Sequence, residues 1–199
     1  MLILKQQAQC EIEVKKSRFI AIAHPIQELS QIKELVNETK GLHTGANHVV
    51  HAAVLGPKGD LYSCSDDHEP KNTAGRPALE VLKGSGVTNI LILVVRYFGG
   101  TLLGTGGLVK AYGDSVREIL SIIKTEELVE KISFSFSIPY NLYSTVKIEL
   151  NALQADIKHE DFATEVSLFG SLPKSNRDRL SSRIIELTGG QYSVSFTDL

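Results

Sequence analysis

A glycine-rich segment between residues 96 and 112 constrains this chain more than any other part of its sequence. Apolar residues run without interruption from Ile90 to Val95 before it, which is typical of a central strand buried on both faces. Apolar residues at helical spacing follow it and predict a helix over residues 103–124. The segment between them contains Gly99, Gly100, Gly104, Gly106 and Gly107. The order is therefore a strand, a glycine loop and a helix start.

Such a loop favours binding of an anion. Glycine adopts positive φ angles and lets another group approach the backbone closely. The first N–H groups of the following helix have no partner within it, and the helix dipole adds positive potential there. The segment lacks the Gly-Lys-Ser/Thr ending of a Walker loop and the Gly-x-Gly-x-x-Gly order of a dinucleotide fingerprint. We therefore expect a phosphate or carboxylate site without either nucleotide motif.

A second segment, Ser65 to Pro77, also carries chemistry. It combines three carboxylates, one imidazole and two cations with hydroxyl groups, and loops of this kind often carry function. Thr73 or Gly75 would begin the helix predicted over residues 76–83, which provides a second set of free amides. In the alternative interpretation the acids are solvated, Thr73 only caps the helix, and Arg76 pairs with a nearby carboxylate.

The remaining pattern predicts an α+β protein of two domains, 1–125 and 130–199, divided at an acidic stretch. The first domain has strands over 10–14, 18–23, 48–55 and 61–65, and a helix over 27–39 that Gly41 ends. The second has a strand over 132–138, a helix, strands over 155–160 and 162–169, a helix over 175–187 capped by Ser175 and stopped by Gly189 and Gly190, and a strand over 192–196. This βαββαβ order is ferredoxin-like.

Composition excludes several classes of protein. The 199 residues carry a net charge of -2, so any basic surface must be local. Two cysteines provide no disulfide framework, which favours a reducing cytoplasm. The first residues turn polar too soon for a signal peptide, and the apolar run before the glycine loop is too short to cross a bilayer. We expect a soluble cytoplasmic protein that does not contact the membrane.

Three motifs along the first domain resemble the YigZ/IMPACT family. The first is Lys16-Ser17-Arg18-Phe19-Ile20-Ala21. The second matches an Asp-Gly-Glu-Pro-x-Gly-Thr-Ala-Gly-x-Pro pattern at Asp67, Glu69, Pro70, Thr73, Ala74, Gly75 and Pro77. The third matches at Val94, Arg96, Tyr97, Phe98, Gly99, Gly100, Leu103, Gly104, Gly106, Gly107, Leu108, Ala111 and Tyr112. The match departs at His68 and Asn72, where the family usually has glycine.

The resemblance implies a fold and a field of activity. The first domain would resemble the second domain of small-subunit ribosomal protein S-five, and the second domain the last domain of elongation factor G. Family members are linked to regulation of translation, and the eukaryotic relatives are thought to bind the activator of a stress-responsive initiation-factor kinase. Bacterial members have no settled activity. These implications rest on analogy of family and fold rather than on a site.

Our hypothesis is a non-enzymatic, translation-associated regulator that binds RNA, the ribosome or a translation-factor partner through a groove between the two loops. We expect no catalytic residue, no cofactor and no metal. Tyr97 or Phe98 could stack on bases, although Phe98 at a strand end is more typical of a core residue. The expected ligand- and anion-binding residues are Arg18, Asp67, Glu69, Thr73, Gly75, Arg76, Arg96, Tyr97, Gly99, Gly100, Gly104, Gly106, Gly107 and Lys110.

Three alternatives accompany this hypothesis. One is an enzyme or binding protein for a small phosphorylated or nucleotide ligand, with Asp67 and Glu69 as metal ligands or bases. Another is a pure protein-interaction module, as the eukaryotic relatives suggest. The third is a metal site among the histidines and acids of residues 43–69, although no Cys-x-x-Cys or His-Glu-x-x-His pattern is present. A Cys64–His68 nucleophile pair is weaker still, since Cys64 falls in a strand pattern.

Overall fold

The computed structural model describes residues 1–198, which form two compact units. The first unit is Met1–Leu128, and the second begins at Val129. Each unit packs helices against an antiparallel sheet, so the α+β class predicted from the sequence is confirmed. None of the helices in this described part of the chain is both long enough and apolar enough to span a membrane.

The first unit is built on five antiparallel strands. Strand β7 (Ile90–Tyr97) is central, buried along its length up to Arg96, and flanked by two strands on each side. The continuous apolar run predicted this position correctly. The sheet order is β2 (Ala8–Val14), β3 (Ser17–Pro25), β7, β4 (His48–Leu55) and β5 (Leu61–Ser65).

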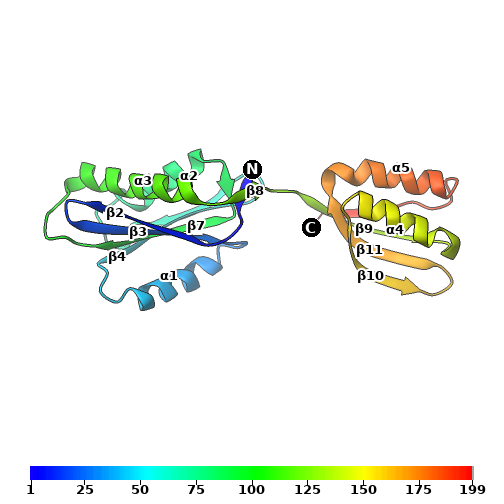
Figure 1. Cartoon of the computed structure of the whole chain (residues 1–199), viewed down its shortest axis with the longest axis horizontal. Coiled ribbons are helices and arrows are strands. Elements are labelled where there is room, and N and C mark those ends of the chain that lie inside the picture. The colour runs from blue at the N-terminus through cyan, green and yellow to red at the C-terminus, as the bar shows by residue number, and fades with distance from the viewer. Residues whose placement is uncertain (199) are drawn as a thin grey trace. The chain divides into compact units, whose positions relative to one another are not determined.

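Helices cover both faces of this sheet (Figure 1). Helices α2 (Gly75–Gly84) and α3 (Gly104–Ile122) lie on one face, and α1 (Gln31–Leu42) lies on the other. Side chains of a strand alternate between faces, so Arg96 points to the α2 and α3 side while Tyr97 points to the α1 side. Gly41 does not end α1 as expected, because the helix continues through it to Leu42.

A small second sheet joins three short strands of the first unit. Strand β1 (Leu2–Leu4) pairs in parallel with β6 (Val87–Thr88) and antiparallel with β8 (Thr125–Glu127). The sequence analysis did not find these strands, because two or three residues show no periodicity. The pairing with β1 makes residues 125–127 part of the first unit.

The second unit has the ferredoxin-like order that the sequence predicted. Its strands pair antiparallel in the order β10 (Asp156–Phe162), β11 (Val166–Pro173), β9 (Lys131–Ile138) and β12 (Ser195–Asp198). Helices α4 (Tyr143–Ala152) and α5 (Arg177–Leu187) follow short 3-10 turns at Tyr140–Leu142 and Lys174–Asn176. Ser175 was wrongly expected to cap α5: Asn176 occupies the cap position, and its side chain makes no capping bond.

Candidate functional site

A cavity of about 480 Å³ lies where two loops of the first unit meet. The acidic loop (residues 66–74) precedes α2, and the glycine loop (residues 98–103) precedes α3. Spacing alone could not show that these loops converge. The volume falls in the range of small-molecule sites. The cavity is lined by Asn47, His48, His68, Glu69, Pro70, Arg96, Phe98, Leu102, Leu103, Gly104, Thr105 and Leu108.

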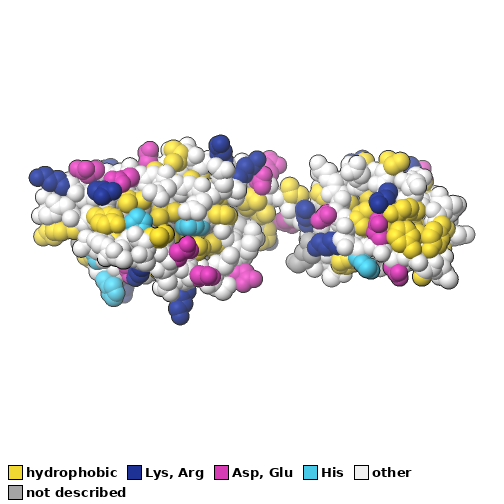
Figure 2. All heavy atoms as spheres, turned by 60° about the horizontal axis from the view of Figure 1, so that its bottom comes forward, with side chains coloured by type: hydrophobic (Ala, Val, Ile, Leu, Met, Phe, Trp, Pro, Cys, Tyr) yellow, Lys and Arg dark blue, Asp and Glu magenta, His cyan; other side chains and the backbone are white. Residues whose placement is uncertain are grey.

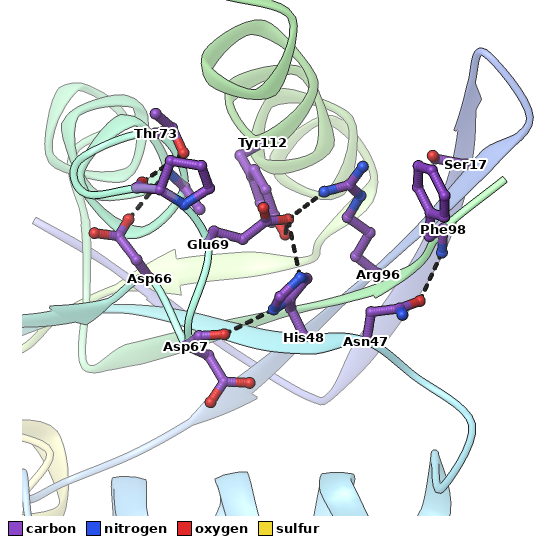
Figure 3. A network of polar contacts seen from close by, with 12 residues as sticks. Ser17, Asn47, His48, Asp66, Asp67, Glu69, Thr73, Arg96, Phe98 and Tyr112 are labelled. Atoms are coloured by element: carbon purple, nitrogen blue, oxygen red, sulfur yellow. Dashed lines mark hydrogen bonds and ion pairs between the residues drawn. The ribbon is translucent and has the colours of Figure 1, made fainter. Parts of the chain in front are cut away.

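A buried polar network around Glu69 forms one wall (Figure 3). Glu69 Oε1 accepts hydrogen bonds from Arg96 Nη1 at 2.5 Å and from the Tyr112 hydroxyl at 2.8 Å. Glu69 is 7% exposed and Arg96 is 6% exposed, so water screens this ion pair little. The network therefore holds the acidic loop against the end of β7 and against α3.

Burial also keeps the Tyr112 phenol neutral. Removal from water raises the pKa of Tyr112 far above its ordinary value, and the neighbouring Glu69 carboxylate raises it further. The hydroxyl therefore donates to Glu69 at every physiological pH. Tyr112 was expected only as an apolar residue of the long helix, and its polar role could not be found from helical spacing.

The His48 ring lies between the acidic loop and Glu69 (Figure 3). Its Nδ1 is 2.8 Å from the backbone carbonyl oxygen of Asp67. Because a carbonyl oxygen only accepts, Nδ1 carries the hydrogen, and this bond fixes the ring orientation. The other nitrogen, Nε2, lies 3.8 Å from Glu69 Oε1. From the sequence, His48 was expected only as one of the histidines of a metal site, and its place beside Glu69 was not predicted.

The Asp67 carboxylate is not part of the cavity lining. It accepts hydrogen bonds from Lys40 Nζ at 2.6 Å and from the Val49 backbone N–H at 2.7 Å. Burial opposes ionisation of this group, but the two hydrogen bonds outweigh burial, and the pKa of Asp67 is lowered. Asp67 thus joins the acidic loop to α1 and β4, and only its carbonyl oxygen contacts the cavity residue His48.

The start of α2 is already occupied by a carboxylate of the chain itself. Asp66 accepts backbone hydrogen bonds from Asn72 at 2.8 Å, Ala74 at 3.1 Å and Gly75 at 2.8 Å. The Thr73 hydroxyl is buried and donates to the Pro70 carbonyl oxygen. Thr73 and Gly75, which were expected to contact a ligand, therefore face Asp66 and the loop rather than the cavity.

The start of α3 has no such cap. The residue before it, Leu103, supplies no side-chain acceptor, and the first turn contains no acidic residue. Gly104 has a φ of +72°, which turns the glycine loop into the helix. Gly104 and Thr105 both line the cavity. An anion in the cavity could therefore reach the first amides of α3.

The other glycines of the loop and of the first turn of α3 have separate roles. A side chain at Gly99 would collide with the backbone of Lys16, so this glycine allows the loop to pack against the β2–β3 turn. Its N–H donates to the Ser17 hydroxyl at 3.2 Å. Gly100 has a φ of +82°, and Gly106 faces open space. A side chain at Gly107 would press against Leu103.

Of the expected site residues, only Glu69, Arg96 and Gly104 line the cavity, and the expected cations Arg18, Arg76 and Lys110 and the aromatic Tyr97 lie away from it. Arg18 makes a two-pronged ion pair with Glu11 and lies 5.4 Å from the Tyr97 ring centre. The Tyr97 hydroxyl contacts His43 Nδ1 on the α1 side. Lys110 is exposed and pairs with Asp114, while Arg76 is exposed on α2.

The cavity is consequently less positive than expected. Arg96 is its one cationic lining residue, and Glu69 offsets that charge. Figure 2 shows charged side chains of both signs spread over the visible face of the first unit. Attraction of an anion to the cavity therefore depends on the amides and dipole of α3.

The wall formed by the glycine loop is apolar and exposed. Phe98 is 44% exposed and Leu102 is 82% exposed, so the expectation that Phe98 belongs to the core is wrong. Phe98 donates its backbone N–H to Asn47 Oδ1 at 2.8 Å, which holds the end of β7 next to β4. The Arg96 guanidinium lies 5.7 Å from the Phe98 ring centre. An aromatic ring is thus available beside the polar wall.

The histidines of the metal alternative have other partners. His43 contacts the Tyr97 hydroxyl, and His51 Nε2 lies 3.0 Å from the Ser63 hydroxyl. Among residues 1–198, no three His, Cys, Asp or Glu side chains gather as metal ligands do.

Both departures from the family pattern fall on positive φ angles. His68 has a φ of +70° and Asn72 a φ of +63°. Glycine adopts this region without strain, and Asn tolerates it better than most residues. The acidic loop therefore keeps the backbone that glycine would give it, with an exposed imidazole added at the cavity.

Fold and cavity together define a two-unit α+β protein with a cavity between two loops of its first unit. Residues 15–120 match the Impact N-terminal domain, and residues 136–191 match a domain of unknown function, DUF1949. This chain belongs to the IMPACT family.

Similar proteins extend over nearly the whole chain. An IMPACT family member of Haemophilus influenzae is 34% identical, covering 100% of this chain and 97% of its own length. IMPACT family member YigZ of Escherichia coli is 35% identical, covering 92% and 90%. A crystal structure titled as a hypothetical protein has a TM-score of 0.73 at 32% identity, covering 100% of this chain and 96% of that one.

Proposed function

We propose that this protein is a non-enzymatic, translation-associated regulator that binds RNA through the cavity of its first unit. The observation that carries the proposal is the uncapped start of α3, which opens into a cavity beside Arg96. Backbone N–H groups at a helix start are a recurrent phosphate site. The link to translation is an expectation from the family, whereas phosphate binding is an expectation from this geometry.

The cavity suits one nucleotide of an unpaired strand. Proteins that bind single-stranded nucleic acid combine phosphate contacts with aromatic rings on which bases stack. Phe98 supplies an exposed ring, and the apolar Pro70 and Leu102 lie on the same cavity. Because the lining charges cancel, we expect few phosphate contacts and a shallow dependence of affinity on salt.

The polar side chains at the cavity favour binding over catalysis. Glu69 and Arg96 are bonded to each other, and Tyr112 is neutral and bonded to Glu69. These contacts hold the loop in place and leave no activated nucleophile in the network. The cavity volume of about 480 Å³ specifically favours a second candidate, in which the ligand is a small phosphorylated molecule or a free nucleotide.

The substitution Thr105→Asp tests the proposal. Thr105 is exposed in the first turn of α3, where a carboxylate would occupy the helix start and repel an anion while favouring the helix. Thr145→Asp is the matched control, since Thr145 is exposed in the first turn of α4 in the second unit. We expect Thr105→Asp to weaken binding of single-stranded RNA at low salt by about tenfold or more, and the control to leave it unchanged.

Equal RNA binding by both variants and the parent chain would contradict the proposal. Loss of binding to a small phosphorylated ligand, with no RNA binding by the parent, would favour the second candidate. A partner retained on the parent chain after nuclease treatment, and equally on Thr105→Asp, would instead favour the protein-interaction module.

A further inference from the structure

The polar wall of the cavity has hydrogen-bonding capacity that the chain does not use. Glu69 Oε1 already accepts from Arg96 and Tyr112. The Glu69 side chain is 3% exposed, and no hydrogen bond from residues 1–198 reaches its Oε2. Because Oε2 is not among the fully buried polar atoms that lack a partner, it is accessible from the cavity. A carboxylate oxygen can accept two hydrogen bonds, so the cavity wall presents an acceptor without a donor from the chain.

A second acceptor faces the same place. Because His48 Nδ1 donates to the Asp67 carbonyl oxygen, Nε2 of the neutral ring has a free lone pair. Nε2 lies 3.8 Å from Glu69 Oε1, too far for a hydrogen bond between them. His48 and Glu69 both line the cavity, so donors of one ligand can reach Nε2 and the free Oε2, and a ligand that buries them without donors binds unfavourably.

Residues of the cavity lining also have unused donors. Asn47 accepts the Phe98 N–H through Oδ1, which leaves its NH₂ group for the cavity that Asn47 lines. Arg96 is buried, and its Nε–H has no partner among the described residues. The cavity thus combines two neighbouring acceptors, at least one donor and the exposed ring of Phe98.

We propose that this cavity selects a guanine nucleotide, either free or as an unpaired guanosine in RNA. The inference rests on the proposed function and names the base that occupies the site. Guanine is the base whose pairing edge has two adjacent donors, N1–H and N2–H₂, beside the acceptor O6. The donors match Glu69 Oε2 and His48 Nε2, and O6 matches the NH₂ group of Asn47.

The other bases leave the acceptors poorly matched. Adenine and cytosine place a ring-nitrogen lone pair beside their amino group, so that lone pair would face a carboxylate or imidazole acceptor. Uracil has a single N–H with a carbonyl oxygen on each side. Buried acceptors without donors discriminate strongly against such ligands.

The apolar wall and the helix start agree with the same ligand. The Phe98 ring stacks on the purine, which is a larger surface than a pyrimidine. The phosphate then lies at the amides of Gly104 and Thr105, which line the same cavity as Glu69. One guanine nucleotide uses the polar wall, the aromatic ring and the uncapped helix together.

Calorimetric titration of the whole protein with GMP, AMP, CMP, UMP and inosine monophosphate tests the inference. The titrations are run at about pH 8, where an ordinary imidazole is neutral. We expect GMP to bind about tenfold or more tightly than AMP, CMP and UMP. Inosine monophosphate lacks only the 2-amino group, so it is expected to bind with intermediate affinity. That comparison changes the ligand alone and needs no protein variant.

Protein variants locate the preference. Glu69→Gln replaces the carboxylate by an amide of similar shape and is expected to abolish the preference for GMP over AMP. Phe98→Ala is expected to weaken both purines by about tenfold, since stacking of a base is lost. Phe169→Ala is the matched control, because Phe169 lies in the second unit with the same 44% exposure.

A parallel arm uses single-stranded RNA of fixed length with one central G or A. Tighter binding of the G strand with no binding of free GMP supports the inference with RNA as the source, and the reverse supports a free nucleotide. Equal affinity for all bases in both arms, abolished by Thr105→Asp, overturns the guanine inference but not the proposed function. Absence of binding in both arms overturns both.

Discussion

Helices α2 and α3 each follow a loop that lines the same cavity, yet only the start of α3 lines the cavity itself. Both start at a glycine after an irregular loop, and neither has a capping side chain at its N-cap residue. At α2, however, the Asp66 carboxylate reaches three amides from six to nine residues upstream. The first turn of α3 contains no acid, and its cap residue is Leu103. A glycine-rich helix start is therefore available to an anion only where no carboxylate of the chain already accepts hydrogen bonds from its amides.

The two starts are also tied to each other. Glu69 belongs to the loop before α2, and Arg96 is the last but one residue of β7, which precedes the loop of α3. Tyr112, from within α3, donates to the same carboxylate oxygen. The position of the α3 start relative to the α2 start therefore depends on the buried ion pair between Glu69 and Arg96.

The largest effect is expected from Arg96→Met. Methionine fills much of the same volume but leaves the buried Glu69 carboxyl without its cation. Loss of one partner of a buried pair lowers the free energy of unfolding by about 3–5 kcal/mol. Urea unfolding followed by circular dichroism measures it. The double variant Glu69→Gln/Arg96→Met is the control and should recover most of the loss, because no buried charge remains; equal losses in both would contradict the explanation.

Asp66→Ala tests the occupied helix start directly. Removal of the carboxylate leaves three amides without their acceptor, and we expect the free energy of unfolding to fall by about 2 kcal/mol. Asp66→Asn retains one acceptor oxygen and should lose less. If α2 differs from α3 only by this cap, inorganic phosphate will stabilise Asp66→Ala more than the parent chain. A loss under about 0.5 kcal/mol would show that the cap contributes little.

The sequence predicted local structure much better than it predicted the site. The buried run before Arg96 and the alternation of the second unit depend on neighbours in sequence, and both elements were placed correctly. The cap on α2 depends on Asp66, which lies beyond the short spacing of local capping motifs. No periodicity connects such residues.

The polar wall shows the same limit. Glu69 was expected to face a ligand, but its partners Arg96, Tyr112 and His48 come from two strands and a helix. Strand alternation places Arg96 and Tyr97 on opposite faces, which explains why Tyr97 lies away from the cavity. The exposed Lys110 pairs with Asp114 on its own helix and not with a group in the cavity. Charge in the sequence does not reveal which charges are paired.

A smaller effect is expected where this chain departs from the family pattern. His68→Gly removes the cost of holding a non-glycine residue at a positive φ. Part of this gain is lost, because glycine has greater conformational freedom in the unfolded chain. The net gain in the free energy of unfolding is about 0.5–1 kcal/mol. Asn72→Gly is the matched control in the same loop and should change stability less, since Asn tolerates this conformation. A loss on His68→Gly would indicate that the imidazole makes a stabilising contact.

The smallest effect concerns Asp67, the neighbour of the capping residue, whose carboxylate serves α1 and β4 instead of α2. Its folded-state pKa is lowered by the hydrogen bonds from Lys40 and Val49, which outweigh burial. The stabilisation is therefore fully present above the ordinary pKa of Asp, which is about 4, and is lost as the pH falls through the lower pKa of the folded state.

Asp67→Asn should make the stability of the first unit less dependent on pH in this acid range, measured as the urea midpoint between about pH 6 and 2.5. Asp60→Asn, at an exposed turn of the same unit, controls for the loss of one carboxylate and should retain the parent's pH dependence. If both variants lose stability with acid as steeply as the parent, the acid response of the unit comes from other carboxylates, and the contrast between the two neighbouring aspartates would be one of position only.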